Sequence, residues 1–186
     1  MDLRSLKENI NDALKLFIFI SIIFIIIIYV VSVTQVVGIS MQPTLTDGNV
    51  LVLDKLSYRF QEVKRGDIIS LDYVDTKNLI KRVIGLPGEH VSIKNSKVYI
   101  NGKLLSESYI SKNIEYSDFD LADLGYDVIP ENMYFVLGDN RTDGNSIDSR
   151  RIGLIKKKSI NGKIILRFWP INKIDTYFKE KSYDEV

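Results

Sequence analysis

The sequence predicts a mostly β protein in which an N-terminal single transmembrane helix precedes an antiparallel β-sheet domain. Two observations carry this prediction. The chain from Leu16 to Val37 is almost wholly apolar, and no charged residue lies between Lys15 and Asp47. After Gly38 the pattern changes to short β-rich runs separated by turn residues, without a long amphipathic helix. The near-neutral mean hydropathy of the whole chain therefore describes neither part.

Residues 16–37 are the predicted membrane span. As a helix these 22 residues would be about 33 Å long, which is enough to cross a hydrocarbon core of about 30 Å. A buried core helix seldom has so long an unbroken apolar run. A cleaved signal peptide would have a shorter apolar region followed by a small-x-small site, and no such site precedes Gly38. We therefore predict an uncleaved anchor.

Positive charges around the span predict its orientation. Arg4, Lys7 and Lys15 precede it, whereas Lys55 is the sole basic residue in the twenty positions after Val37. The excess of positive charge predicts residues 1–15 on the cytoplasmic side and residues 38–186 outside the cytoplasm of a single-pass cell-membrane protein. An outer domain of 149 residues is large enough to bury its own core.

Short runs of β-branched and aromatic residues predict seven strands in the outer domain. The predicted strands are Val50–Leu53, Asp67–Tyr73, Leu79–Ile84, Val91–Ile93, Val98–Ile100, Met133–Leu137 and Ile164–Phe168.

Two Asn-Gly pairs and one irregular segment lie among these strands. Asn101-Gly102 predicts a type I′ hairpin, because both turn residues tolerate positive φ, and Asn161-Gly162 is a weaker signal of the same kind. Residues 106–127 are acidic, contain tyrosines and show no period. We predict a variable surface excursion there, for which a solvated loop is favoured over a partner-binding role.

Composition excludes several functional classes. Without cysteine, and with a single histidine, the chain has no thiol nucleophile, no disulfide and too few imidazoles for the common hydrolytic zinc sites. The 25 Lys and Arg residues nearly balance 24 Asp and Glu residues, so no field that would attract nucleic acid is indicated. We expect no metal, no other cofactor and no nucleic-acid partner.

A candidate nucleophile follows the predicted span. Ser40 lies in Gly38-Ile39-Ser40-Met41-Gln42-Pro43, where a serine before a proline turn is ordinarily a capping or turn residue. Its position is informative, because three residues beyond Val37 it would be at most about 11 Å along the chain from the end of the span. Any chemistry of Ser40 would then occur at the bilayer surface.

Two residues are candidate bases for this serine. The usual triad would need His90, which follows Pro87-Gly88-Glu89 and is better explained as a solvated or structural histidine. Lys81 is the alternative, although strand alternation puts it on the face opposite Ile80 and Arg82, where lysines ordinarily meet solvent. Lowering the pKa of its amine from about 10.4 to about 8 would cost about 3 kcal/mol of differential stabilisation, which apolar burial can supply.

A third motif follows the predicted strand Met133–Leu137. It reads Gly138-Asp139-Asn140-Arg141 and continues to Ser146-Ile147-Asp148-Ser149-Arg150. The ordinary interpretation is a polar turn with surface ion pairs that contribute little stability. A buried bidentate pair of carboxylate and guanidinium would instead hold this loop rigid against the site.

Together these motifs resemble bacterial type I signal peptidase, a Ser/Lys-class leader peptidase, and the single anchor resembles its Gram-positive members. SMQPTL around Ser40 is similar to the family's nucleophile box, RGDIIS at 65–70 to its second box and IKRVIGLPGE at 80–89 to its lysine box. GDNR with SIDSR resembles the last box, and RFWP at 167–170 the C-terminal ending. The resemblance spans nearly all of residues 16–186 and implies the family's coiled antiparallel β architecture for the catalytic domain.

The resemblance also implies roles for the site residues. Ser40 would be the nucleophile, Lys81 the general base, and the backbone N–H of Ser40 the oxyanion donor. Gly38 stands where Gram-negative members add a hydroxyl donor, and Ser146 corresponds to the serine that hydrogen-bonds the lysine. The ionic scaffold around the dyad would consist of Asp139, Arg141, Asp148 and Arg150.

The function implied is that of a membrane-bound serine endopeptidase that removes signal peptides from exported preproteins, with those preproteins and the lipid bilayer as partners. The substrate would lie as an added strand between segments 34–37 and 79–81. The cut would follow small residues at the first and third positions before it. The walls of the pockets for these residues would be Val36, Met41, Leu45 and Ile80.

One departure from the family and two alternatives stand beside this hypothesis. Four residues, Thr142-Asp143-Gly144-Asn145, separate Arg141 from Ser146, where the family usually has two. A related Ser/Lys protease that cleaves itself or a repressor would ordinarily carry a DNA-binding module in place of a span. A non-catalytic assembly factor with a peptidase-like fold would have lost the serine or the lysine, and both are present here.

Overall fold

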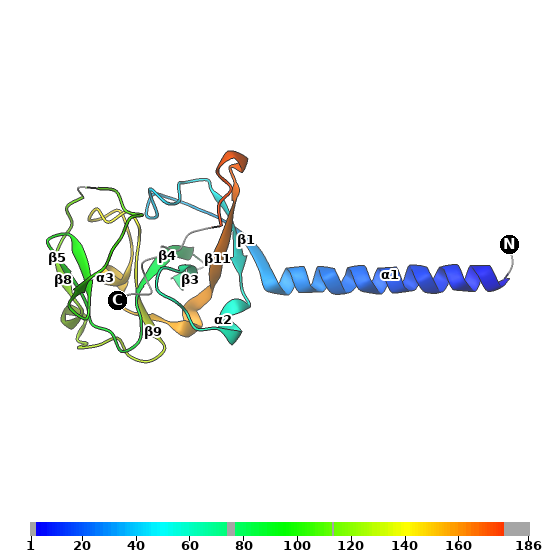
Figure 1. Ribbon diagram of the computed structural model, residues 1–186, viewed down its shortest axis with the longest axis horizontal. Helices are drawn as coiled ribbons and strands as arrows, with labels where there is room; N and C mark the ends of the chain where they lie inside the picture. Colours follow the sequence, from blue (N-terminus) through cyan, green and yellow to red (C-terminus); the bar gives the residue numbers. More distant parts are fainter. Residues whose placement is uncertain (1–2, 74–76, 113, 177–186) are drawn as a thin grey trace.

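The computed structural model describes residues 3–73, 77–112 and 114–176. It contains one long helix, α1 (Leu3–Val30), that projects from one end of a β domain with two antiparallel sheets. Figure 1 shows β1 where α1 joins this domain, and β5 and β8 of the smaller sheet at the opposite end. The mostly β architecture with one N-terminal apolar helix confirms the predicted fold class.

The helix ends earlier than the predicted span. Within α1, the 22 residues Asn9–Val30 are long and apolar enough to cross a membrane, and no described side chain in their most apolar window is buried. The chain then leaves the helix at Val30, not at Val37, and continues as β1 (Val31–Gln35). Alternation of valine with Ser32 and Thr34 favours a strand, and an apolar strand that continues an apolar helix is invisible to hydropathy alone.

The larger sheet has the strand order β1-β2-β11-β3-β4-β9-β10, and every neighbouring pair is antiparallel. Its strands after β1 are β2 (Val50–Asp54), β3 (Ile68–Tyr73), β4 (Lys77–Gly85), β9 (Met133–Leu137), β10 (Ile155–Lys156) and β11 (Ile160–Trp169).

The smaller sheet has the order β7-β6-β5-β8. Its strands are β5 (Val91–Lys94), β6 (Lys97–Ile100), β7 (Lys103–Leu104) and β8 (Phe119–Asp120). Short helical turns complete the domain: α2 (Ser57–Phe60), η1 (Leu121–Leu124), α3 (Ser149–Ile152), η2 (Lys157–Ser159) and η3 (Ile171–Lys173).

One of the two Asn-Gly predictions is confirmed and the other is wrong. Asn101 and Gly102 have φ of 50° and 80°, as a type I′ turn requires, and join β6 to β7. Asn161-Gly162 lies inside β11 at a register shift opposite β3. A Cβ on Gly162 would collide with the backbone oxygen of Asp54. This glycine therefore serves the close approach of two strands and not a hairpin.

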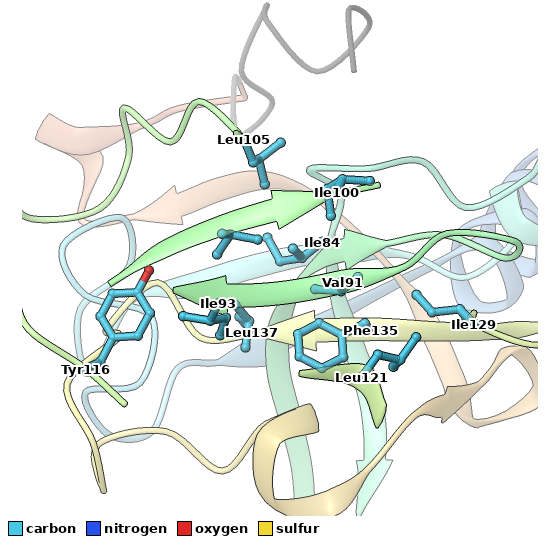
Figure 2. Close-up of a cluster of buried hydrophobic side chains, with 11 residues drawn as sticks. Ile84, Val91, Ile93, Ile100, Leu105, Tyr116, Leu121, Ile129, Phe135 and Leu137 are labelled. Atoms are coloured by element: carbon cyan, nitrogen blue, oxygen red, sulfur yellow. The ribbon is translucent and has the colours of Figure 1, made fainter. Parts of the chain in front are cut away.

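The described residues of segment 106–127 are mostly exposed or partly exposed, but the side chains of Tyr116 and Leu121 pack into the core, which the surface excursion did not predict. β8 pairs with β5, and Leu121 and Tyr116 are buried in the cluster that joins the smaller sheet to β9. Figure 2 shows Leu121 beside Phe135 and Tyr116 at one end of this cluster. The apolar residues of the segment are spaced irregularly, so no period revealed them.

Candidate active site

Ser40 lies on a loop that is anchored to the sheet at both ends. Between β1 and β2, the Val36 N–H donates to Asn49 O over 2.8 Å, and the Gly48 N–H donates to Val36 O over 3.0 Å. Met41 and Leu45 fix the loop from below, because both are buried in the cluster beneath it. Ser40 therefore has a defined position at the surface of a packed core.

The start of this loop depends on a glycine. Gly38 has a φ of +92°, a conformation that side-chain-bearing residues rarely adopt, and its N–H donates to Asp47 Oδ1 over 2.7 Å. Because α1 ends at Val30 and not at Val37, the five residues of β1 place up to about 17 Å of extended chain between the helix and the loop of Ser40. The predicted limit of about 11 Å from the end of the span is thus wrong.

Lys81 meets Ser40 from β4, where it pairs with Ile69 of β3. Its Nζ lies 2.8 Å from Ser40 Oγ and 2.7 Å from Ile80 O, and Lys81 is 1% exposed. Burial lowers the pKa of Lys81 to about 8, against the opposing charges of Asp148 and Asp139. A buried amine bonded to a hydroxyl, and neutral in part near pH 8, has the geometry and basicity to accept the hydroxyl proton.

The other candidate base lies elsewhere. His90 Nδ1 is 2.8 Å from Asp127 O, and His90 Nε2 is 3.4 Å from Asp120 Oδ2. Both contacts are to the segment that packs against the smaller sheet. His90 is therefore a structural histidine that does not contact Ser40.

Asp139 is paired with Arg82, a residue that sequence reasoning did not assign to the site. Arg82 Nε and Nη2 donate to the two Asp139 oxygens over 2.8 and 2.6 Å, and Nη1 donates to Gly66 O over 3.0 Å. Arg82 is 1% and Asp139 0% exposed. The ring of Tyr109 covers the guanidinium, with 4.0 Å from Arg82 Cζ to the ring centroid. This buried bidentate pair holds the loop after β9 against β4.

Arg141 is paired with Glu107, which sequence reasoning also missed. Arg141 Nη1 lies 3.0 Å from Glu107 Oε2, and Nη2 bonds the other Glu107 oxygen. Its Nε donates to Gly138 O over 2.9 Å, and the hydroxyl of Tyr116 lies 3.3 Å from Nη1. Glu107 comes from the segment 106–127, so that segment supplies a carboxylate to the scaffold beside the dyad.

A third pair joins Asp148 and Arg150. Arg150 Nε and Nη2 each lie 2.9 Å from an Asp148 oxygen, and the Gly138 N–H donates to Asp148 over 3.1 Å. Burial alone would raise the pKa of Asp148, but the hydrogen bonds and charge of Arg150 outweigh it and lower that pKa. Asp148 is therefore a buried anion whose charge favours the protonated form of Lys81.

Ser146 is buried behind the dyad without the expected contact to the lysine. Ser146 is 3% exposed, and its Oγ forms no well-aligned hydrogen bond with any of the described residues. The hydroxyl is nevertheless close enough to Asp148 to help lower the pKa of that carboxyl. Ser146 packs against Gly138, where a Cβ would collide with both Ser146 Oγ and the backbone oxygen of Ser40. The assigned hydrogen bond from Ser146 to Lys81 is thus a point on which the structure differs from the resemblance.

The extra residues 142–145 form a tied-down turn. Gly144 has a φ of +85°, and Asp143 accepts hydrogen bonds from the N–H and hydroxyl of Ser117. Arg150 also lies 3.7 Å from Asp143. The insertion therefore packs against the segment 106–127, and its residues do not line the groove beside Ser40 and Lys81.

A groove of about 430 Å³ runs past the dyad. β4 pairs with β9 only from Arg82 onward, so the preceding β4 residues present a free edge, as β1 does at the end of the sheet. Of the predicted pocket walls, Val36, Met41 and Ile80 line the groove, whereas Leu45 is enclosed in the cluster beneath it. The residues that line the groove are Thr34, Gln35, Val36, Val37, Ser40, Met41, Asn78, Leu79, Ile80 and Lys81.

Within the described part of the chain, no group of three or more His, Cys, Asp or Glu side chains is placed to hold a metal ion.

The chain is similar to proteins of known family. Residues 10–169 match the family described as signal peptidase, peptidase S26. The chain is 36% identical to a signal peptidase I of Bacillus caldolyticus over 180 residues, which cover 92% of this chain and 98% of the relative. It is 43% identical to signal peptidase I V of Bacillus subtilis strain 168 over 138 residues, which cover 70% of this chain and 81% of the relative.

Two further similarities are to a staphylococcal and an enterococcal protein. Signal peptidase IB of Staphylococcus aureus strain Mu50 is 32% identical over 188 residues, with 95% of this chain and 97% of the relative covered. The crystal structure of a signal peptidase I from Enterococcus faecalis V583 is 41% identical, with a TM-score of 0.49, and covers 55% of this chain and 97% of its own.

Proposed function

The chain belongs to the signal peptidase family, peptidase S26, and from this premise we propose that Ser40 and Lys81 form its catalytic dyad. Membership makes the protein a serine peptidase that removes signal peptides from preproteins. The observation that carries the dyad is the 2.8 Å contact between Lys81 Nζ and Ser40 Oγ, with Lys81 buried and its pKa lowered to about 8.

In the proposed mechanism, neutral Lys81 accepts the Ser40 proton as Oγ attacks the scissile carbonyl carbon. The developing oxyanion accepts a hydrogen bond from the Ser40 N–H, which donates to no partner among the described residues. The lysine then gives its proton to the leaving amine, and an acyl-enzyme remains on Oγ. A water molecule, deprotonated by the same lysine, hydrolyses this ester and releases Ser40.

The three buried ion pairs support the dyad by rigidity. The pairs surround Gly138 and consist of Asp139 with Arg82, Arg141 with Glu107, and Asp148 with Arg150. Because Gly138 has no side chain, Ser146 and the Ser40 backbone can approach it closely. We assign Gly38, Ser146, Asp139, Arg141, Asp148 and Arg150 to the support of the site. Their contribution is to hold the reacting groups within hydrogen-bonding reach, since small displacements reduce rate steeply.

The groove defines the proposed substrate mode. A signal peptide would lie extended between the free edges of β1 and β4, where main-chain hydrogen bonds give affinity and alternate side chains point into the surface. Val36, Met41 and Ile80 limit the depth of the groove, which favours small residues at the first and third positions before the cut.

The anchor fits this substrate mode. α1 would span the bilayer with its N-terminus in the cytoplasm, and the catalytic domain would stand outside. An extended substrate segment beside the five residues of β1 would cover about 17 Å between its own apolar helix and Ser40. The enzyme and its substrate would therefore use equivalent lengths of extended chain to reach the same height above the membrane.

The dyad is tested with the detergent-solubilised full chain and a preprotein that carries alanine at both small-residue positions. Ser40→Ala and Lys81→Met should each abolish cleavage while the chain stays folded. His90→Ala is the matched control and should cleave within about twofold of the parent, because His90 contacts Asp127 and Asp120 and not Ser40. Substantial cleavage by either folded dyad variant would overturn the assignment.

The orientation is tested by labelling, for which the absence of cysteine gives a clean background. Ser5→Cys, which precedes the apolar stretch Asn9–Val30, and Lys103→Cys are made separately and treated on intact cells with a membrane-impermeant maleimide. Lys103→Cys should react on intact cells, and Ser5→Cys only after lysis. The reverse pattern would invert the proposed topology.

A further inference from the structure

Asn140 connects the loop after β9 to the loop between β1 and β2 that carries Ser40, here called the nucleophile loop. The proposed mechanism does not use Asn140. Its backbone N–H donates to Ser40 O over 3.0 Å, and its side-chain Nδ2 donates to Ile39 O over 3.2 Å. Two consecutive carbonyl groups of the nucleophile loop are thus held by one residue. These contacts fix the peptide units on both sides of Ser40.

Two contacts at Ile39 O determine where the Ser40 N–H points, because this oxygen accepts from Asn140 Nδ2 and, over 3.1 Å, from the Gln42 N–H of its own turn. The Ile39–Ser40 peptide is not among the cis bonds, and a trans peptide is planar with its C=O and N–H pointing in opposite directions. A donor that holds Ile39 O on one side therefore aims the Ser40 N–H to the other side. That N–H donates to no residue in ranges 3–73, 77–112 and 114–176, so it is available to a ligand.

We propose that Asn140 is a positioning residue that orients the Ser40 N–H as the oxyanion donor. The inference rests on the proposed function of Ser40. Gly38 brings no side-chain hydroxyl to the site, so the oxyanion depends on the aim of this one backbone donor. Preorganised donors of this kind act through their fixed direction, because they need not reorient as the charge develops.

The loop around Asn140 is built to hold this position. Its neighbours Asp139 and Arg141 are each 0% exposed and each paired in a buried ion pair. Asn145 Nδ2 lies 3.4 Å from Asn140 Oδ1, so the carbonyl side of the amide has its own donor and Nδ2 faces Ile39 O. Asn145 comes from the insertion between Arg141 and Ser146, which gives part of that insertion a role at the site.

The test is the Asn140→Ala variant, which keeps the backbone bond to Ser40 O and removes only the side-chain bond. We expect kcat for a preprotein to fall about threefold to tenfold, the range of one hydrogen bond, with KM unchanged. An isosteric variant without the donor, Asn140→Asp, should lose as much. Since the Asn140 side chain is partly exposed, the midpoint of thermal unfolding should stay close to that of the parent.

A second readout separates positioning from structure. A peptide aldehyde adds reversibly to Ser40: the Oγ–C bond forms, the carbonyl π bond opens, and the Oγ proton moves through Lys81 to the new oxygen at the Ser40 N–H. Its affinity should fall in Asn140→Ala by the same factor as kcat. The affinity of an uncleaved preprotein should not change when Asn140→Ala is added to the Ser40→Ala background.

The control is Lys157→Ala, which loses an exposed contact of 3.0 Å from Nζ to Glu62 Oε2, away from the groove, and should leave kcat unchanged. If Asn140→Ala keeps the parent kcat and aldehyde affinity while Ser40→Ala and Lys81→Met are inactive, the inference is overturned and the proposed function stands. A change in KM alone would also overturn it. Activity in the dyad variants would instead overturn the proposed function.

Discussion

Lys81 Nζ lies 2.8 Å from Ser40 Oγ, and the lysine that makes this contact is 1% exposed. Burial on an antiparallel strand removes the amine from water and lowers its pKa to about 8. The lysine of the proposed dyad is therefore both close enough to the hydroxyl to accept its proton and partly neutral at physiological pH.

The first prediction concerns pH. In the proposed dyad Lys81 accepts a proton only when its amine is neutral, so kcat/KM should rise as pH increases and level off above a midpoint near 8, the pKa of Lys81 in the free enzyme. The measurement is the initial rate of preprotein cleavage between pH 6 and 10. A flat profile, or a midpoint near that of an exposed lysine, would contradict it.

The charges around Lys81 provide a second prediction. Asp148 favours the charged lysine and so opposes the effect of burial on the Lys81 pKa. Asp148→Asn should remove that opposition and move the midpoint of the kcat/KM profile to lower pH, provided the variant remains folded. The control is Asp118→Asn, since Asp118 is an exposed residue whose carboxylate contacts Asn95. A shift to higher pH would show that Asp148 acts differently.

The third prediction links catalysis to stability. Below pH 8 the folded chain must hold a buried ammonium, whereas unfolded Lys81 takes up its proton already near pH 10.5. Unfolding is therefore accompanied by proton uptake between these values, and lower pH destabilises the fold by about 3 kcal/mol in total. Lys81→Met lacks this penalty. The difference in unfolding free energy between Lys81→Met and the parent should therefore be about 2 kcal/mol more in favour of the variant at pH 7 than at pH 9.5, as measured by denaturant titration.

The fourth prediction concerns the segment 106–127. Glu107→Gln should leave the guanidinium of Arg141, which is 0% exposed, without its carboxylate. Breaking one side of a buried ion pair is expected to cost about 3 kcal/mol of unfolding free energy. Glu115→Gln is the control, because Glu115 lies in the same segment but is exposed, and it should change stability by less than about 0.5 kcal/mol. Equal effects of the two variants would mean that Glu107 is not a structural anchor.

The fifth prediction concerns the close approach at Gly138. A methyl group there would meet Ser146 Oγ and the backbone oxygen of Ser40. Because the Ser40 backbone must move to relieve this contact, Gly138→Ala should lower kcat about 100-fold. Gly102→Ala, at a hairpin with no atom near the added methyl, should cost stability through its positive φ but keep kcat. Normal turnover by a folded Gly138→Ala variant would exclude this packing role.

Local patterns in the sequence were sufficient for much of the fold. All seven predicted strands are present, and Asn101-Gly102 forms its hairpin, because alternation and turn chemistry act over a few residues. The apolar run predicted one helix. Its end at Val30 depends on the pairing of β1 with β2, which is a contact between residues about twenty positions apart.

The site divides in the same way. The motifs around Ser40, Lys81 and Asp139 marked where chemistry could occur, because their residue types and order are written in the chain. The sequence did not predict three further contributors to the site, which are Arg82, Glu107 and Asn140. Their partners are distant in sequence, and no local rule pairs Arg82 with Asp139 or Glu107 with Arg141.

The sequence by itself determined the class of this protein, which is an apolar anchor followed by a β domain with a serine and a lysine in recognisable boxes. Only the tertiary structure decided that Lys81 is buried and 2.8 Å from Ser40, that Leu45 lies beneath the groove, and that Asn140 holds the nucleophile loop. The reason is physical: basicity and hydrogen-bond direction depend on solvent exclusion and on groups brought together by folding, and neither is a property of a residue and its neighbours in sequence.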